Sequence, residues 1–329
     1  HRAEEMTVTA AAPEHAPVGL RRSLSLPLIT FYGLGNILGA GIYVLIGKVA
    51  GHAGLFAPLS FVLASLLACL TAFSYAELAA RYPLSAGEAV YVQAGLGLKS
   101  LAALVGLLIV LAGVVSAATI LRGFTGYLQV FVPMPAAPSI VVMVLLLGGL
   151  AAWGIAESVR VAALITLVEI AGLLLVLYVA APVMLTTDQV MPDFSPLLES
   201  GAWYGIFLGG FLAFYAFIGF EDMVNISEEV RNPTVNMPRA ILLSVIISTL
   251  LYTAVVIIAI MLVPPTQLAQ SDAPLAEVYT AATGKQAVVI SLIGMFAVVN
   301  GALIQLIMAS RLLYGMASKT WLPEFLAQV

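Results

Sequence analysis

Long apolar runs, separated by short polar segments, divide this chain from end to end. A run of about 20 apolar residues is long enough to cross the hydrocarbon core of a bilayer as a helix. Such runs occupy residues 27–48, 55–79, 101–127, 137–156, 161–184, 203–227, 239–263 and 286–314. The pattern therefore predicts an all-α integral membrane protein with eight transmembrane helices.

The segments around these runs complete the prediction. Residues 81–97 are too apolar for a solvated linker and too interrupted to cross a bilayer, which favours a short helix on the cytoplasmic face. Residues 264–285 open with two prolines and continue as an Ala-rich stretch, which is typical of a helical lid on the outer side. Residues 1–26 begin with a polar stretch containing Ala and Pro, and we interpret them as a disordered cytoplasmic N-terminus.

Composition supports the membrane assignment and disfavours several functions. Hydrophobic residues make up 62% of the 329 residues and charged residues only 9%, whereas soluble domains carry about 25% charged residues. The single cysteine, Cys69, cannot form an internal disulfide. The three histidines (His1, His15 and His52) lie outside the spans and show no metal-ligand spacing. A zinc-dependent membrane enzyme is therefore disfavoured, and no cofactor, metal or nucleic-acid partner is expected.

Lysine and arginine are sorted between the two sides of the predicted membrane. With the N-terminus inside, ten of the 13 basic residues fall in cytoplasmic segments, and only Lys48, Arg122 and Lys285 fall outside. Such a bias sets the orientation of multi-pass proteins. We therefore expect a multi-pass protein of the plasma membrane whose N-terminus and 231–239 loop are cytoplasmic.

The first predicted span, ITFYGLGNILGAGIYVLIGKV, is apolar but rich in glycine. Because glycine in a helix interior costs about 0.5–1 kcal/mol relative to alanine, the Gly39-Ala40-Gly41 step marks a candidate break. Irregular backbone at membrane depth lies where it is buried in protein or lines a cavity, so a break would be a candidate binding site. The alternative is close helix packing through Gly35-x-x-x-Gly39.

The sixth predicted span repeats this design. It is interrupted near residues 216–219 and then places Glu221 and Asp222 at membrane depth or near the inner interface. Carboxylates inside a membrane are costly and usually functional, although hydration at the cytoplasmic end is an alternative for Asp222. Spans one and six are five apart, so they cross the membrane in opposite directions. Discontinuous helices at matching places in inverted halves point to a transporter site.

Several motifs resemble one transporter superfamily. GNILGAGIYV and FYAFIGFED…SEEVRNPTVNMPRAI are similar to the first- and sixth-helix signatures of the amino acid–polyamine–organocation (APC) superfamily. ESVRVAALITLVEI resembles the entry of its fifth helix, and ASRLLYGMASKTWLP the end of its eighth. The likeness covers about residues 26–323.

The resemblance implies a leucine-transporter-like fold, with two inverted five-helix repeats and discontinuous first and sixth helices. Residues 27–184 would form the first repeat, residues 203–314 the first three helices of the second, and residues 315–329 the start of a cytoplasmic loop. The remaining helices of the second repeat are missing and the first residue is His. We therefore expect the chain to be a fragment of a longer protein.

The resemblance also implies where an amino acid would bind. Free N–H groups at Ala40 and Gly41 would face the substrate carboxylate, with Gly39 allowing close approach. Backbone carbonyls at the two breaks would hold the ammonium group, and the matching positions are Ile37, Tyr215 and Ile218, beside Gly219. Family members often carry a hydroxyl residue in place of Ala40, so one contact to the carboxylate is lost here.

Four side chains are candidates for the pocket lining: Asn36, Ser116, Tyr215 and Gln305. For Ser116, a hydrogen bond between helices is an equally open interpretation. Because no ionisable residue lies clearly in the pocket, a neutral or apolar amino acid is favoured over arginine or a polyamine.

Glu169 is a candidate for proton coupling. It lies nine residues after Arg160, which is about 13 Å along a helix and well below the interface. Some proton-coupled members of the superfamily carry a lysine at the matching position. Glu221 is the second candidate, and a permanently protonated Glu169 bonded to a backbone carbonyl is the structural alternative.

Together these features favour a secondary active transporter that moves an amino acid across the lipid bilayer by alternating access and proton symport. An amino acid or polyamine exchanger is the main alternative. A channel and a membrane enzyme are less favoured, since the spans carry no histidine and the chain has neither HExxH nor GxSxG. The sequence leaves the substrate, the coupling mode and the oligomeric state open.

Overall fold

The computed structural model describes residues 22–132, 134–186, 200–271 and 273–327. The α-helices of this part of the chain are α1 (Leu26–Ala53), α2 (Ala57–Arg81), α3 (Gly87–Leu96), α4 (Lys99–Phe131), α5 (Ala136–Trp153), α6 (Ile155–Thr186), α7 (Ser200–Phe217), α8 (Pro233–Leu262), α9 (Pro265–Gln270), α10 (Pro274–Thr283) and α11 (Val288–Ser318). Its 3₁₀ helices are η1 (Gly54–Phe56), η3 (Glu221–Glu229) and η4 (Glu324–Ala327).

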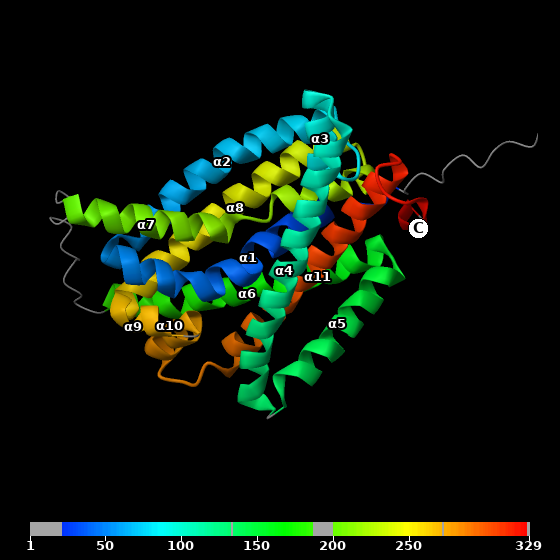
Figure 1. Ribbon diagram of the computed structural model, residues 1–329. Coiled ribbons are helices and arrows are strands. Elements are labelled where there is room, and N and C mark those ends of the chain that lie inside the picture. Colours follow the sequence, from blue (N-terminus) through cyan, green and yellow to red (C-terminus); the bar gives the residue numbers. More distant parts are fainter. Residues whose placement is uncertain (1–21, 133, 187–199, 272, 328–329) are drawn as a thin grey trace, which may run out of the picture.

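The eight predicted spans are confirmed, because eight helical segments of the described residues are long and apolar enough to cross a membrane. The short α3 confirms the helix predicted within residues 81–97, and α9 and α10 confirm the helices predicted within residues 264–285. α3 lies at one end of the molecule, and α9 and α10 lie together at the other (Figure 1). Most of the predicted disordered N-terminus falls outside the described residues.

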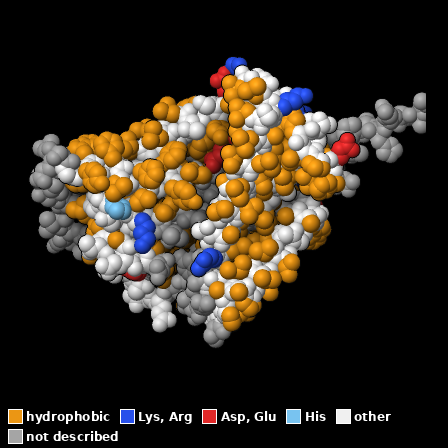
Figure 2. Space-filling model, in the orientation of Figure 1, with side chains coloured by type: hydrophobic (Ala, Val, Ile, Leu, Met, Phe, Trp, Pro, Cys, Tyr) orange, Lys and Arg blue, Asp and Glu red, His pale blue; other side chains and the backbone are white. Residues whose placement is uncertain are grey.

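Large apolar side chains cover the outside of the helix bundle. Figure 2 shows hydrophobic side chains over most of one face, with few charged ones among them. On α2 and α4 the exposed residues include Leu66, Leu70, Phe73, Leu108 and Leu111. A water-soluble protein rarely exposes so wide an apolar surface, so these faces suit contact with lipid.

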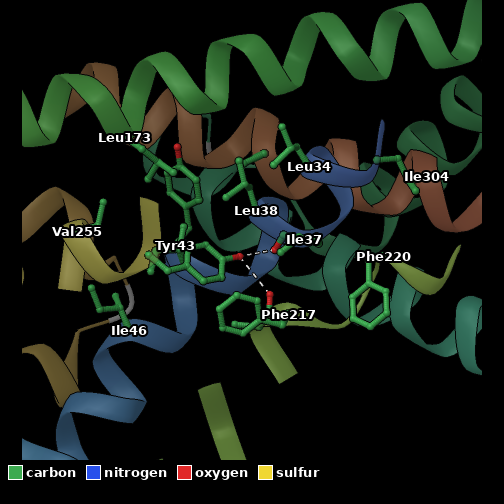
Figure 3. Packing of buried hydrophobic residues seen from close by; sticks show 14 of the residues in the cluster. Leu34, Ile37, Leu38, Tyr43, Ile46, Leu173, Phe217, Phe220, Val255 and Ile304 are labelled. Atoms are coloured by element: carbon green, nitrogen blue, oxygen red, sulfur yellow. Dashed lines mark hydrogen bonds between the residues drawn. The ribbon is translucent and has the colours of Figure 1, made fainter. Parts of the chain in front are cut away.

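Helix α1 lies at the centre of the bundle, in contact with α2, α6, α7, α8 and α11 (Figure 1). Its side chains are therefore enclosed by protein rather than by lipid. Figure 3 shows part of this core, with Leu34, Ile37 and Leu38 of α1 near Leu173 of α6 and Ile304 of α11.

The break predicted in the first span is wrong for this structure, because α1 runs as one helix from Leu26 to Ala53. Glycine permits a break without imposing one, and here it serves close packing. A Cβ on Gly39 would lie 3.0 Å from the carbonyl oxygen of Ala297, and one on Gly41 would lie 2.9 Å from that of Ala216. Close helix packing, the alternative interpretation, therefore accounts for both glycines.

The sixth span is discontinuous, as predicted: α7 ends at Phe217, and the 3₁₀ helix η3 begins at Glu221. Gly219 has φ 134°, in the region that favours glycine. A Cβ on Gly219 would also lie 2.8 Å from the Asn36 amide nitrogen of α1. Glycine at this position therefore both forms the break and lets it pack against α1.

Backbone and ionic contacts fasten the helix ends near α3. The Leu24 N–H donates to the Glu229 carbonyl (2.9 Å), and the Leu24 carbonyl accepts from the Arg231 N–H (2.9 Å). These bonds form a parallel bridge between Leu24 and Val230. Arg311 of α11 adds an ion pair of 3.1 Å with Glu229, whose side chain is almost fully buried. The start of α1, the end of η3 and α11 are thus tied together.

Candidate functional site

A cavity of about 370 Å³ lies beside the break in the sixth span, between α1, α4, α7 and α11. Its lining residues are Asn36, Ile37, Gly41, Leu45, Ser116, Thr119, Ile120, Tyr215, Ala216, Ile218, Val298, Gly301 and Gln305. Most of the lining is apolar, with a few amide and hydroxyl groups among it. This combination is typical of a site for a small molecule.

The structure brings most of the predicted site residues to this cavity. Those that line it are Asn36, Ile37, Gly41, Ser116, Tyr215, Ile218 and Gln305. The sequence prediction missed the remaining lining residues, which are Leu45, Thr119, Ile120, Ala216, Val298 and Gly301. Most of these are ordinary apolar residues of a membrane helix, so their composition gave no signal.

Three other predicted residues stand apart from the lining. Gly39 packs against α11 at Ala297. The Gly219 carbonyl accepts a hydrogen bond of 2.9 Å from the Asn36 amide, so it supports a lining residue. The side chain of Ala40 lies outside the description, and its backbone belongs to the continuous α1. In such a helix N–H groups bond to carbonyls four residues back, so the free donors predicted at Ala40 and Gly41 are not displayed.

Tyr252 of α8 connects α1 to α7 through two residues of the cavity lining, Ile37 and Ala216. Its hydroxyl donates to the Ile37 carbonyl (2.5 Å) and lies 3.1 Å from the Ala216 carbonyl. Its ring packs edge-on against Phe61 and Phe217. The Ile37 carbonyl, predicted to hold the substrate ammonium, is therefore already bonded. A tyrosine within an otherwise apolar span was the signal that could have found this residue.

Asp222 forms the floor beneath two lining residues. Its Oδ2 accepts a hydrogen bond of 2.6 Å from the Asn36 amide and one of 2.7 Å from the Gln305 amide. Gln305 Nε2 also lies 3.5 Å from Asn36 Oδ1. Asp222 is buried, so hydration, the alternative considered from the sequence, does not describe it. Glu221, the next residue, accepts a hydrogen bond of 2.8 Å from the Gly219 N–H and so stabilises the break.

Glu169 of α6 is fully buried on another side of α1. Its Oε1 accepts a hydrogen bond of 2.8 Å from the Asn300 amide of α11, which also donates to Thr166 Oγ1 at 3.0 Å. Oε2 has no hydrogen-bond partner among the described residues. Asn300, an isolated amide in the last span, was not predicted.

Glu88 of α3 is a further buried carboxylate, and it lies outside the membrane-spanning helices. Neither of its oxygens has a hydrogen bond of normal geometry among the described residues, although the Asn225 amide and the backbone N–H of Glu88 are near enough to lower its pKa in part. Burial raises the pKa of Glu88 to about 8, and the charge of Asp222 adds to the rise. The sequence prediction did not single out Glu88.

The described residues contain no group of three or more His, Cys, Asp or Glu side chains arranged to hold a metal ion. A second cavity, of about 580 Å³, lies at the opposite end from α3, where it is lined mainly by α10 and the start of α11. Its lining includes Glu277, Thr280, Gln286 and Ser291.

Comparisons with known proteins agree with the geometry. The family described as "Amino acid permease" matches residues 24–329. The branched-chain amino acid permease of Bacillus subtilis (strain 168) is 31% identical, over 94% of this chain and 70% of that protein. The methylthioribose transporter of the same organism is 32% identical, over 77% of this chain and 58% of that protein.

A plant relative is similar over a comparable stretch. Cationic amino acid transporter 3, mitochondrial, of Arabidopsis thaliana is 28% identical, over 97% of this chain and 55% of that protein. The chain thus spans between 55% and 70% of the length of these relatives.

Proposed function

Because this chain belongs to the amino acid permease family, within the APC superfamily, we propose that it carries a neutral or apolar amino acid across the plasma membrane by alternating access. The observation that carries the proposal is the cavity beside the broken sixth span, enclosed by α1, α4, α7 and α11. Transporters of inverted-repeat design bind their substrates at such breaks.

The lining of the cavity supports an apolar substrate side chain. Leu45, Ile120 and Val298 offer apolar contacts, whereas the polar groups gather around Asn36 and Gln305. An amino acid could therefore direct its charged groups to one part of the cavity and its side chain to another. The similarity to a branched-chain amino acid permease supports the same substrate class.

The closed end of the bundle supports alternating access. The bridge between Leu24 and Val230 and the ion pair between Arg311 and Glu229 tie the helices together near α3. The positive-inside bias places this end in the cytoplasm. The conformation therefore fits a carrier that is closed toward the cytoplasm, and release inward requires these contacts to separate.

Glu169 is the proposed proton-coupling residue. Its carboxylate is fully buried, and one of its oxygens has no partner among the described residues. A buried carboxylate that keeps one hydrogen bond can gain or lose a proton without losing its position. Glu221, at the break itself, is the second candidate, and its carboxylate is held by the Gly219 N–H.

Uptake into proteoliposomes tests the function. The complete natural protein should accumulate radiolabelled L-leucine when the outside is made acidic, and uptake should saturate. Unlabelled L-isoleucine and L-valine should compete, and L-lysine, L-arginine and methylthioribose should compete weakly. Accumulation that depends on amino acid inside the vesicles, with no response to ΔpH, would show an exchanger, and uptake that never saturates would show a channel. Uptake of no amino acid would overturn the proposal.

A further inference from the structure

Asp222 is a buried carboxylate that forms no ion pair with a basic side chain of the described residues. Its side chain is 5% exposed. The ion pairs of the described residues join Arg81 with Glu77, Arg160 with Glu157 and Arg311 with Glu229. Asp222 takes part in none of them, although a buried charge is costly unless a counter-charge or several hydrogen bonds stabilise it.

The ionisable groups around Asp222 do not compensate its charge. Those that interact with it electrostatically are Glu88 on α3, Glu221 beside it on η3, Tyr75 on α2 and Tyr32 on α1. All of them are acidic or neutral. The described residues therefore supply no positive charge to Asp222, and the two residues that donate hydrogen bonds to it, Asn36 and Gln305, both line the cavity.

The amides of Asn36 and Gln305 connect Asp222 to that cavity by hydrogen bonds. An ionised carboxylate only accepts hydrogen bonds, so Asn36 and Gln305 must both turn their NH₂ groups toward it, as they do at 2.6 and 2.7 Å. The side-chain oxygen of Gln305, Oε1, then lies on the side of Gly113 of α4, where a Cβ on Gly113 would be 3.1 Å from it. The carboxylate of Asp222 thereby polarises the amides of Asn36 and Gln305, which both line the cavity.

Three backbone carbonyls near the cavity already accept hydrogen bonds. The Tyr252 hydroxyl is bonded to the Ile37 carbonyl and lies 3.1 Å from the Ala216 carbonyl. The Tyr215 carbonyl accepts from the Ile218 N–H at 3.3 Å. A cationic group that enters the cavity therefore finds its strongest complement at Gln305 and Asn36.

We propose that Asp222 is the counter-charge of the substrate's ammonium group, acting through the amides of Asn36 and Gln305. This inference rests on the proposed function and deepens it, because it names the property that the site selects: an ammonium group on a small, largely apolar molecule. Asp222 is then a positioning and selectivity residue that does not itself need to touch the substrate. Carboxylic acids without an ammonium group should be rejected.

The test compares three inhibitors of radiolabelled L-leucine uptake in proteoliposomes of the complete natural protein. They are L-leucine, 3-methylbutylamine, which lacks the carboxylate, and 4-methylpentanoate, which lacks the ammonium group. Asp222→Asn keeps the shape and removes the charge. We expect the inhibition constants of leucine and the amine to rise about 10- to 100-fold, in line with the loss of a charge-assisted hydrogen bond. The constant of 4-methylpentanoate should stay unchanged or fall.

Three further variants complete the test. The quantity compared is the ratio of the inhibition constant of leucine to that of 4-methylpentanoate. Gln305→Met removes the connecting amide while Asp222 stays, and it should raise this ratio as Asp222→Asn does. The double variant should raise the ratio little more than either single variant. Glu77→Gln, at an exposed carboxylate paired with Arg81, is the matched control and should leave the ratio unchanged. The ratio is measured within one preparation, so a smaller amount of folded protein does not affect it.

The outcomes separate this inference from the proposed function. If the inhibition constants of all three compounds rise by the same factor in both Asp222→Asn and Gln305→Met, Asp222 has a merely structural role and the inference is overturned. Equal inhibition of the wild type by leucine and 4-methylpentanoate would overturn it as well, while leaving amino acid transport standing. Absence of leucine uptake by the wild type would overturn the proposed substrate class first, and with it this inference.

Discussion

Glu169 and Asn300 connect α6 to α11 through a hydrogen bond of 2.8 Å, and both side chains are fully buried. Helix α1 packs directly on this pair, since a Cβ on Gly35 would lie 2.5 Å from the Asn300 amide nitrogen. A change of charge on Glu169 would therefore affect α1 and α11, two helices that line the cavity beside the break in the sixth span. This position makes Glu169 the natural site to test for coupling.

Glu169→Gln should separate transport from coupling. The amide retains the size of the side chain but cannot exchange a proton. We expect the variant to bind and exchange amino acid at rates within about threefold of the wild type, and to lose accumulation driven by a pH gradient. Uptake into proteoliposomes with and without an imposed ΔpH measures both properties.

A variant on the same helix controls for general effects. Glu157→Gln changes an exposed carboxylate that pairs with Arg160 at 3.5 Å, and it should retain ΔpH-driven accumulation. If Glu169→Gln still accumulates substrate under ΔpH, Glu169 has only a structural role. Loss of accumulation in Glu221→Gln instead would transfer the coupling role to that residue.

Gly41→Val should abolish amino acid binding. A Cβ at this position would lie 2.7 Å from the Tyr252 hydroxyl and 2.9 Å from the Ala216 carbonyl oxygen, and Gly41 also lines the cavity. Overpacking costs about 1–3 kcal/mol, so the thermal midpoint should also fall. Scintillation-proximity binding and thermal unfolding in detergent measure the two effects.

Gly148→Val is the control for this substitution, because a Cβ on Gly148 of α5 would meet no other atom within 4 Å. It should bind amino acid normally. Near-normal affinity in Gly41→Val would show that the glycine is unnecessary for the binding site.

Glu88→Gln should flatten the dependence of stability on pH. The folded protein holds the Glu88 proton up to a pKa of about 8, whereas the reference value is 4.5, because burial disfavours the ionised form. This contribution to stability is complete below about pH 4.5 and is lost as the pH rises through about 8. We expect the decrease of the thermal midpoint between pH 5.5 and pH 8.5 to be smaller in Glu88→Gln than in the wild type. An unchanged decrease, with Glu77→Gln as control, would contradict the prediction.

The orientation in the membrane can be tested by labelling. In a variant without Cys69, a cysteine at the exposed Val235 should react with a membrane-impermeant maleimide only after cells are permeabilised. The reason is the excess of Lys and Arg on that side of the predicted spans. Labelling of intact cells at this position would reverse the topology and the assignment of the closed end to the cytoplasm.

The spans were predictable because runs of apolar residues have a length that the bilayer sets. Sequence also placed Asn36 at the cavity, because its motif resembles that of known transporters, and Gln305, because it is a polar residue in an apolar span. The state of α1 was not predictable: glycine allows both a break and close packing, and only the neighbouring Ala297 and Ala216 carbonyls decide between them. The partners of Asp222 and Glu169 lie far away in the sequence, on other helices, so no local pattern revealed them.

The bridge at Leu24 has a mechanical consequence. Leu24 is bonded on both sides, to Glu229 and to Arg231, so the beginning of α1 and the end of η3 cannot part without breaking two backbone bonds together. If α1 tilts, η3, the second part of the broken sixth span, would therefore move with it. A movement of α1, which lines the cavity, would therefore also displace η3, and a movement of η3 would displace α1.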